Sequence, residues 1–189
     1  MTKLRNFVLS LTFLPGLVAA DELRNVNAGV TPYACTDSGA QYLLAFDPHP
    51  RRLAWGAFGG GPKKGETASE TALRELREET NCVFSEAFLG QLVLKGPSKS
   101  GSYYNFVAEV PYVTKDHIKE RRACRDVERF NWQWVSHDSL IKGLQSDASD
   151  PRVEVVSRPG HTVRIWSGAA KSLRTAMKAG YLPLGDPCR

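Results

Sequence analysis

One short segment of the chain combines a run of glycines with four spaced glutamates, and this combination constrains the fold more than any other feature. The segment reads Gly60, five residues, Glu66, seven residues, and then Arg74-Glu75-Leu76-Arg77-Glu78-Glu79. Residues three and four apart share one face of a helix, so Glu75, Glu78 and Glu79 would repel one another there. A bound divalent cation removes that repulsion, because hard cations prefer carboxylate oxygens. The spacing therefore predicts a metal site.

The residues around the glutamates predict a strand, a turn and a helix. Residues 53–58 read as a strand that leads into three glycines, and Thr67 with Glu70 forms the pattern of a capping box. The apolar stripe of the helix is Ala68, Ala72, Leu73 and Leu76. Helices rich in Glu and Arg are often simply solvated surfaces. Agreement between the turn, the cap, the apolar face and the acidic face favours the metal site here.

This spacing resembles the signature of the Nudix hydrolases, which is Gly, five residues, Glu, seven residues, Arg-Glu-aliphatic-x-Glu-Glu-x-Gly-aliphatic. Asn81 stands where the family has its second Gly, and Asn tolerates a left-handed backbone next best. Phe58 stands before the glycine pair, where the family often has Pro, and Cys82 fills the last aliphatic position. The resemblance covers about residues 27–145. It implies an α/β fold, an α/β/α sandwich around a mixed β-sheet, in a single domain.

The resemblance also implies an activity. Family members use Mg²⁺ or Mn²⁺ to cleave a nucleoside diphosphate, or another diphosphate, that is joined to a further group. The implied metal ligands on this chain are Glu66, Glu75, Glu78 and Glu79. Gly59 and Gly60 would let the substrate approach the backbone closely. Arg74 would hold a helix carboxylate in place, with an ordinary surface ion pair as the alternative.

The residues expected to act in catalysis are Arg74, Glu75, Glu78 and Glu128. The general base stays open between Glu75 and Glu128. Glu128 lies six residues before Trp134, a distance at which many relatives carry an acidic residue, but a plain surface glutamate is the alternative. Glu109 is a weaker candidate. His137 follows Ser136 directly, and this pair reads as a helix start rather than as part of a catalytic triad.

The substrate is less well defined by the sequence. Pro97 lies fifteen residues after the signature, where relatives that cleave ADP-ribose often carry Pro, so ADP-ribose or a related compound is weakly favoured. A polar loop at residues 95–101 is expected to shape the pocket, and Tyr103 or Tyr104 to contact a base. Basic side chains in two loops would suit a more highly phosphorylated substrate: Lys63, Lys64, Lys95 and Lys99.

Two alternative functions remain open. One is a catalytically weak protein that binds or senses a nucleotide outside the cytosol. The other is a secreted effector that hydrolyses another pyrophosphate, such as an inositol pyrophosphate.

Residues 1–20 resemble a secretory signal peptide. Lys3 and Arg5 precede an apolar run that ends in Val18-Ala19-Ala20, which predicts export to the periplasm or the medium with cleavage after Ala20. Residues 21–189 would then be the mature Nudix domain with a C-terminal helical extension, without stable membrane insertion. An uncleaved anchor is the alternative.

Cleavage would lower the formal net charge from +5 to +3, because residues 1–20 contain two basic residues and no acidic ones. This modest excess suits a small anionic diphosphate substrate, and no Arg-rich tract suggests a nucleic-acid partner. The four cysteines are Cys35, Cys82, Cys124 and Cys188. Disulfides are plausible in an exported chain, and three pairings are open, although Cys82 also suits a core thiol. The oligomeric state is not determined by these patterns.

The remaining elements follow from hydrophobic patterning. Strands are expected at residues 28–34, 40–46, 87–94, 103–110 and 131–135, and helices at 138–144 and 168–179. Gly180 would close the last helix. Residues 145–164 show no clear periodicity and read as a surface excursion.

Overall fold

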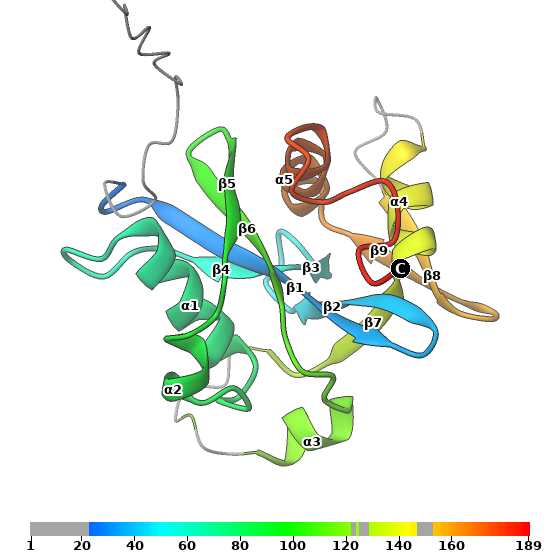
Figure 1. Ribbon diagram of the computed structural model, residues 1–189, viewed down its shortest axis with the longest axis horizontal. Coiled ribbons are helices and arrows are strands. Elements are labelled where there is room, and N and C mark those ends of the chain that lie inside the picture. Colours follow the sequence, from blue (N-terminus) through cyan, green and yellow to red (C-terminus); the bar gives the residue numbers. More distant parts are fainter. Residues whose placement is uncertain (1–22, 122–123, 125–128, 147–152) are drawn as a thin grey trace, which may run out of the picture.

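The structure is a computed structural model that describes residues 23–121, 124, 129–146 and 153–189 (Figure 1). In chain order its elements are β1 (Asn27–Thr36), β2 (Gly39–Asp47), β3 (Ala54–Gly56), β4 (Phe58–Gly60), α1 (Ala68–Glu79), α2 (Glu86–Leu89), β5 (Lys95–Ser100), β6 (Tyr103–Glu109), α3 (Lys115–Glu120), β7 (Trp132–Ser136), α4 (His137–Gln145), β8 (Val153–Arg158), β9 (His161–Ile165) and α5 (Ser167–Lys178).

The strands form one mixed sheet, in the order β5-β6-β1-β2-β3-β9-β8, while β4 pairs with β1 and β7 pairs with β2. β1 runs parallel to β6, with Asn27 opposite Tyr103, and β3 runs parallel to β9, with Trp55 opposite Ile165. The other pairs among the described strands are antiparallel. β1 is buried along most of its length, as expected for a central strand covered on both faces.

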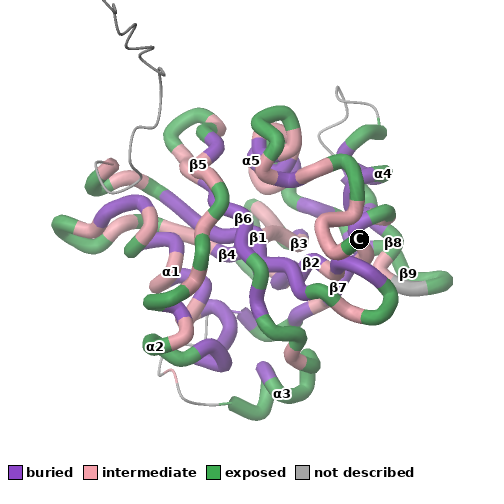
Figure 2. Tube along the Cα trace, viewed as in Figure 1, coloured by how far each residue is buried: buried purple, intermediate pink, exposed green. Residues whose placement is uncertain are grey.

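Helices cover both faces of the sheet, which confirms the α/β/α sandwich (Figures 1 and 2). Successive strand residues point to opposite faces, so Leu43 packs in the core under α1 while Leu44 packs in the core under α4 and α5. The first core includes Ala72 and Leu76 of α1, and the second includes Leu173 of α5. A shift of β2 by one residue would exchange these side chains between the two cores, so the register of β2 is strongly specified.

Two predicted elements are wrong. Residues 87–94 do not form a strand: α2 occupies their start, because the Ser85 hydroxyl caps it by accepting a hydrogen bond from Phe88 N at 3.2 Å. Residues 95–100 are not a loop but the strand β5, with Lys99 opposite Tyr104 on β6. Pro97 is tolerated there because β5 lies at the end of the sheet.

The region after α4 also differs from the expected surface excursion. β8 and β9 form a hairpin in which Val155 pairs with Val163, and the hairpin extends the main sheet through β3. Both valines are buried. The last helix is confirmed as α5, and Gly180 follows it with φ at 78°, a left-handed conformation that favours glycine. The helix α3 had no counterpart among the expected elements.

Two disulfides select one of the three possible pairings. Cys35 of β1 is bonded to Cys188 near the C-terminus, and Cys82 after α1 is bonded to Cys124. Cys82 is therefore not a free core thiol. The predicted signal peptide lies outside the described residues. No helix in the described part of the chain is long and apolar enough to cross a membrane.

Candidate active site

Helix α1 carries three of the four predicted glutamates, and its ends are fixed as the sequence indicates. Thr67 is the N-cap: its hydroxyl accepts from Glu70 N at 3.1 Å, and the Glu70 carboxylate accepts from Thr67 N at 2.8 Å. Past the other end, Asn81 has φ at 52° and donates through its side chain to the Ile118 carbonyl at 3.0 Å. Asn81 therefore takes the left-handed conformation expected of the glycine it replaces.

Arg74 lies among three of the glutamates. Its Nε donates to Glu66 Oε1 at 2.8 Å, and its Nη1 donates to both Glu75 Oε1 and Glu78 Oε2, each at 2.8 Å. Because those two oxygens share one nitrogen, they lie no farther apart than twice that distance. Hydrogen bonds from Arg74 hold the pKa of Glu66 at about 2 and in turn raise the pKa of Arg74. Arg74 is only 16% exposed, so it is not an ordinary surface ion pair.

Two of the helix glutamates face the glycine strand β4 rather than solvent. Gly59 N donates to Glu79 Oε2 at 2.9 Å, and a Cβ at Gly60 would lie 2.6 Å from Glu75 Oε1. Glu75 is 7% exposed and Glu79 is 2% exposed. Glu78 differs from these two, because its side chain is 30% exposed. The glycines allow the carboxylates to approach the strand closely.

Glu79 belongs to a buried chain of charges that reaches β2. Arg129 donates to Glu79 Oε1 from Nε at 2.8 Å and from Nη2 at 2.6 Å, while its Nη1 lies 2.8 Å from Asp47 Oδ2. Arg52 lies 2.8 Å from the same Asp47 oxygen. Burial raises the pKa of Glu79 to about 7 in spite of the nearby Arg129 charge. Burial would also raise the pKa of Asp47, but hydrogen bonds from Arg129 and from the backbone of His49 hold it below its ordinary value.

The donor chemistry of this group suits Mg²⁺ or Mn²⁺, since every candidate ligand is a carboxylate oxygen and three carboxylates converge on one cationic group. Within the described residues, however, no three acidic, His or Cys side chains are arranged to enclose a metal ion. Arg74 accounts for this, because its guanidinium already supplies the positive charge between Glu66, Glu75 and Glu78. A metal ion at this place would have to take over carboxylate oxygens that Arg74 now contacts.

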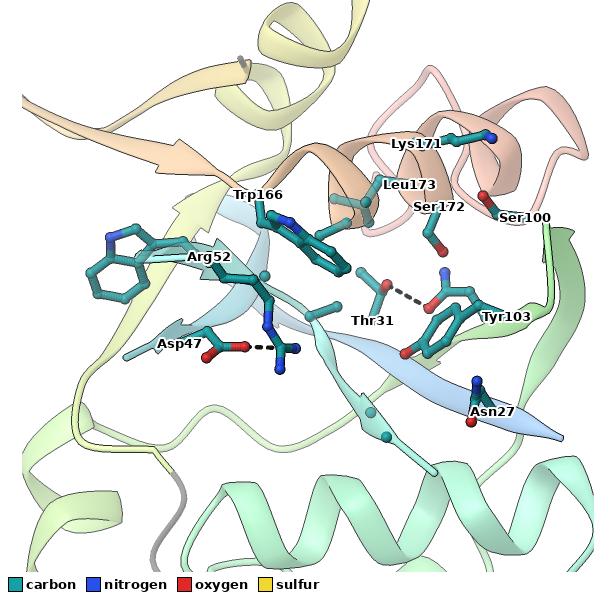
Figure 3. A pocket seen from close by; sticks show the side chains of 18 of the residues that line it. Asn27, Thr31, Asp47, Arg52, Ser100, Tyr103, Trp166, Lys171, Ser172 and Leu173 are labelled. Carbon is teal, nitrogen blue, oxygen red and sulfur yellow. Dashed lines mark hydrogen bonds and ion pairs between the residues drawn. The ribbon is translucent and has the colours of Figure 1, made fainter. Parts of the chain in front are cut away.

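A cavity of about 460 Å³ opens beside the glycine strand, between the sheet and α5 (Figure 3). Gly59, Gly60 and Gly61 line it where it meets the acidic helix, and Arg129 and Asp47 also reach it. Figure 3 shows Trp166 and Ser172 on one side and Tyr103 and Asn27 on the other. The cavity has the size of a small-molecule site and adjoins the carboxylates of α1.

Some of the predicted substrate contacts line the cavity and others do not. Tyr103 lines the cavity, whereas Tyr104 packs against the core on the α1 side. Of the expected loop, Ser100 reaches the cavity but Pro97 does not line it. Burial raises the pKa of the Tyr103 hydroxyl, which donates to the Phe58 carbonyl at 3.4 Å. Tyr103 therefore stays protonated.

Of the four lysines considered from the sequence, Lys63 contacts the acidic group of α1, and Lys95 and Lys99 contact tyrosines instead. Lys95 donates to the Tyr33 hydroxyl at 2.9 Å, and Lys99 lies over the ring of Tyr104. Lys63 pairs with Glu78 at 3.2 Å. No contact is described for Lys64.

Of the two candidate bases outside α1, Glu109 is the one whose position the structure describes, and it lies away from the site. Glu109 accepts from the Tyr33 hydroxyl at 3.5 Å, six residues along β6 from Tyr103 and hence about 20 Å away along the strand. Glu128 lies outside the described residues.

Sequence reasoning missed Arg129, Asp47 and the contribution of α5. Arg129 gave a weak signal, since it stands next to Glu128 ahead of the Trp-containing strand, but a single Arg in a polar segment is usually solvated. The wall formed by Trp166 and Ser172 lies beyond the residues that resemble the family, so no motif pointed to it.

Comparisons with known proteins concern the family and the fold of the chain. A family model described as the NUDIX domain matches residues 26–156. A search of curated proteins found no match. Solved structures with a similar fold include an Ap4A hydrolase binary complex from C. elegans, with 22% identity, coverage of 61% of this chain and 83% of that chain, and a TM-score of 0.45. They also include the Nudix hydrolase RenU from M. smegmatis, with 16% identity, coverage of 84% and 90%, and a TM-score of 0.48.

Proposed function

We propose, because this chain belongs to the NUDIX family and is a hydrolase acting on phosphoric anhydrides, that its substrate is a nucleoside diphosphate joined to a second group. Within this class ADP-ribose and related compounds are weakly favoured, on the position of Pro97 in the sequence alone, since Pro97 does not line the cavity. The reaction would add water across the diphosphate linkage and release two phosphate monoesters.

One observation carries this proposal: the glycine strand β4 has the acidic helix on one side and the cavity on the other. Gly60 contacts the Glu75 carboxylate and also lines the cavity. A diphosphate placed against this strand would thus lie beside the carboxylates, while its substituent extends toward α5. This arrangement suits a substrate with an anionic centre and a larger neutral group.

We propose Glu66, Glu75, Glu78 and Glu79 as the residues that would hold Mg²⁺ or Mn²⁺. A bound divalent ion would neutralise phosphate charge and lower the pKa of a water molecule. Glu78 is the most exposed of the four candidates and Glu79 the most buried. We assign Arg74 the role of keeping the carboxylates near one another before the ion binds. Glu75, against the glycine strand, is the general base that these contacts favour.

The domain limits and the location of the protein are also proposals. Residues 1–20 would be a signal peptide and residues 21–189 the exported domain. The two disulfides support this proposal, because such bonds persist in oxidising compartments. Material recovered from the periplasm or the medium should begin at Asp21, and an intact Met1 in a soluble cytosolic fraction would contradict export.

The enzymatic proposal is tested with a substrate panel and purified residues 21–189. ADP-ribose, dinucleoside polyphosphates, nucleotide sugars, nucleoside triphosphates and an inositol pyrophosphate are each incubated with Mg²⁺, with Mn²⁺ and with EDTA. We expect metal-dependent cleavage with the highest kcat/KM for a nucleoside diphosphate derivative. A dominant activity on the inositol pyrophosphate, or equal activity in EDTA, would overturn the proposal.

A further inference from the structure

Two buried polar side chains line the cavity, and each has one hydrogen-bonding atom without a partner among the described residues. Asn105 on β6 is 1% exposed and Ser172 on α5 is 6% exposed, and both line the cavity. Within the part of the chain that the structure describes, Asn105 Nδ2 and Ser172 Oγ have no hydrogen-bond partner. Buried polar atoms are nearly always paired, since an unpaired one lowers the stability of the folded protein. A pair of such atoms in one cavity therefore points to a ligand that would satisfy them.

The hydrogen bonds around these two side chains determine whether each unpaired atom can act as a donor or as an acceptor. The Thr31 hydroxyl donates to Asn105 Oδ1 at 3.1 Å, shown as a dashed line in Figure 3, so the amide nitrogen is left as a donor. On α5, Thr175 donates to the Lys171 carbonyl at 2.9 Å, the usual local bond of a helical hydroxyl. Ser172 makes no such bond. Its hydroxyl stays available to donate or to accept.

An aromatic wall lies beside them. Trp166 precedes α5, and Figure 3 shows its indole directed into the cavity above Thr31. Its ring lies so close to the first turn of α5 that a Cβ at Gly168 would be 2.5 Å from an indole carbon. Glycine at this position thus allows the ring to lie across the start of the helix. The Arg52 guanidinium lies over the same ring, 5.3 Å from its centre, so an aromatic surface and a cation lie side by side there. A large aromatic ring beside hydrogen-bonding groups suits a flat heterocycle.

Charge is divided along the cavity. The cationic side chains Arg52, Arg129 and Lys171 line it, and the acidic side chain that lines it, Asp47, is already paired with both arginines. Asn105 and Ser172 are neutral. The cavity therefore offers positive charge to an anionic group and neutral hydrogen bonds to another part of the same ligand.

We propose that Asn105, Ser172 and Trp166 form the pocket for the nucleobase of the substrate. Asn105 Nδ2 donates to a ring nitrogen or carbonyl of the base, Ser172 Oγ pairs with the neighbouring edge group, and the base lies against the Trp166 indole. This inference rests on the proposed function for the position of the diphosphate beside β4. It adds that base recognition depends on α5, which lies after the matched family region of residues 26–156.

The neutral hydrogen-bonding groups of Asn105 and Ser172 favour a base over a polyphosphate at this end of the cavity. An inositol pyrophosphate would need several cations around its ring, but Asn105 and Ser172 supply single neutral hydrogen bonds. A planar base needs an apolar face and a few directional partners, which is what the pocket provides.

The test is a binding measurement that needs no hydrolysis. Calorimetric titration of residues 21–189 in EDTA compares AMP, GMP and CMP with ribose 5-phosphate, which lacks a base. We expect a nucleotide to bind more tightly than ribose 5-phosphate. The Ser172→Ala variant should weaken nucleotide binding about fivefold, the value of one typical hydrogen bond, and leave ribose 5-phosphate unchanged.

Two further variants keep the result decisive. Thr175→Ala on the same helix is the matched control, because its hydroxyl bonds within the helix, and should leave nucleotide binding unchanged. Asn105→Leu should weaken binding at least as much as Ser172→Ala, with a thermal melt to verify its fold. Equal binding of ribose 5-phosphate and all nucleotides, or unchanged nucleotide affinity in Ser172→Ala, would overturn the inference.

The outcome is separable from that of the proposed function. Base-dependent binding without cleavage of any diphosphate in the panel would refute the enzymatic proposal and keep the pocket. Cleavage that does not depend on the base would refute the pocket and keep the enzymatic proposal.

Discussion

Arg129 contacts one carboxylate oxygen of Glu79, Oε1, with two nitrogens, Nε at 2.8 Å and Nη2 at 2.6 Å, although fifty residues separate the two residues in sequence. Both side chains are at least nine-tenths buried. The pair joins the last turn of α1 to the segment that leads into β7. Arg129 also forms an ion pair with Asp47, so one guanidinium compensates the charges of a carboxylate on α1 and a carboxylate on β2.

We expect Arg129→Met to destabilise the protein by about 3–5 kcal/mol above pH 7, where Glu79 is ionised, because the variant leaves this charge buried without its compensating cation. Urea denaturation of residues 21–189 measures this. Arg52→Met is the matched control: Arg52 pairs with the same Asp47 oxygen but its side chain is 36% exposed, so its loss should cost less than about 1 kcal/mol. Equal losses in the two variants would contradict the prediction.

Glu78→Gln and Glu79→Gln should each lower kcat by orders of magnitude, since each removes a negative charge from the proposed metal-binding group. Steady-state kinetics with Mg²⁺ measures the effect. Glu86→Gln serves as the control, because Glu86 pairs with Arg77 on an exposed surface and should keep wild-type kcat. Mg²⁺ should also raise the melting temperature of the wild type more than that of either site variant. Near-normal turnover in both variants would remove the basis for the site.

The stability of the metal-free protein should depend on pH through Glu79. Its pKa is about 7 in the folded protein and 4.5 ordinarily, so the native state binds the extra proton between these values. The stability that the native state gains by binding this proton more tightly than the unfolded chain is complete below pH 4.5. It is lost as the pH rises to 7. We expect the free energy of unfolding of the wild type, relative to Glu79→Gln, to fall by at most about 3 kcal/mol over this window.

Urea denaturation in EDTA at several pH values provides the measurement for Glu79. A difference that rises with pH, or that stays flat between pH 4.5 and 7, would show that the buried carboxyl group is not protonated in this range.

Loss of the Cys82–Cys124 disulfide should lower the free energy of unfolding by about 2–4 kcal/mol, mainly because the unfolded chain gains conformational entropy when the bond is absent. The Cys82→Ser/Cys124→Ser variant tests this, with Cys35→Ser/Cys188→Ser for comparison. The closed segments span 42 and 153 residues, so the second variant should lose more. Both should show a larger urea m-value, since their unfolded chains expose more surface. Wild-type stability in both variants would contradict the assignment of structural disulfides.

The acidic helix was predictable because its determinants are local. Thr67 and Glu70 form the cap, the apolar stripe is periodic, and Asn81 ends the last turn, all within one short segment. The same holds for α5 and Gly180. Patterns of this kind are read from neighbouring residues alone.

The misread elements depend on contacts distant in sequence. Residues 95–100 contain Gly, Pro, Ser and Lys, and they form β5 because the edge of β6 supplies hydrogen-bond partners. His161–Ile165 joins β3, about a hundred residues earlier, through Trp55 and Ile165, and Val153–Arg158 then pairs with it. Arg129 could not be identified for the same reason, because its partners Glu79 and Asp47 lie on other elements.

The disulfide between Cys35 and Cys188 also determines how the protein would respond to a protease. A single cut between these two cysteines leaves both fragments covalently joined, because the bond closes almost the whole domain into a ring. α5 and the β8–β9 hairpin lie inside that ring. A molecule cut once would therefore migrate as one band on a denaturing gel without reductant and as two bands with reductant. Helix α5, which lines the cavity, would remain covalently linked to β1.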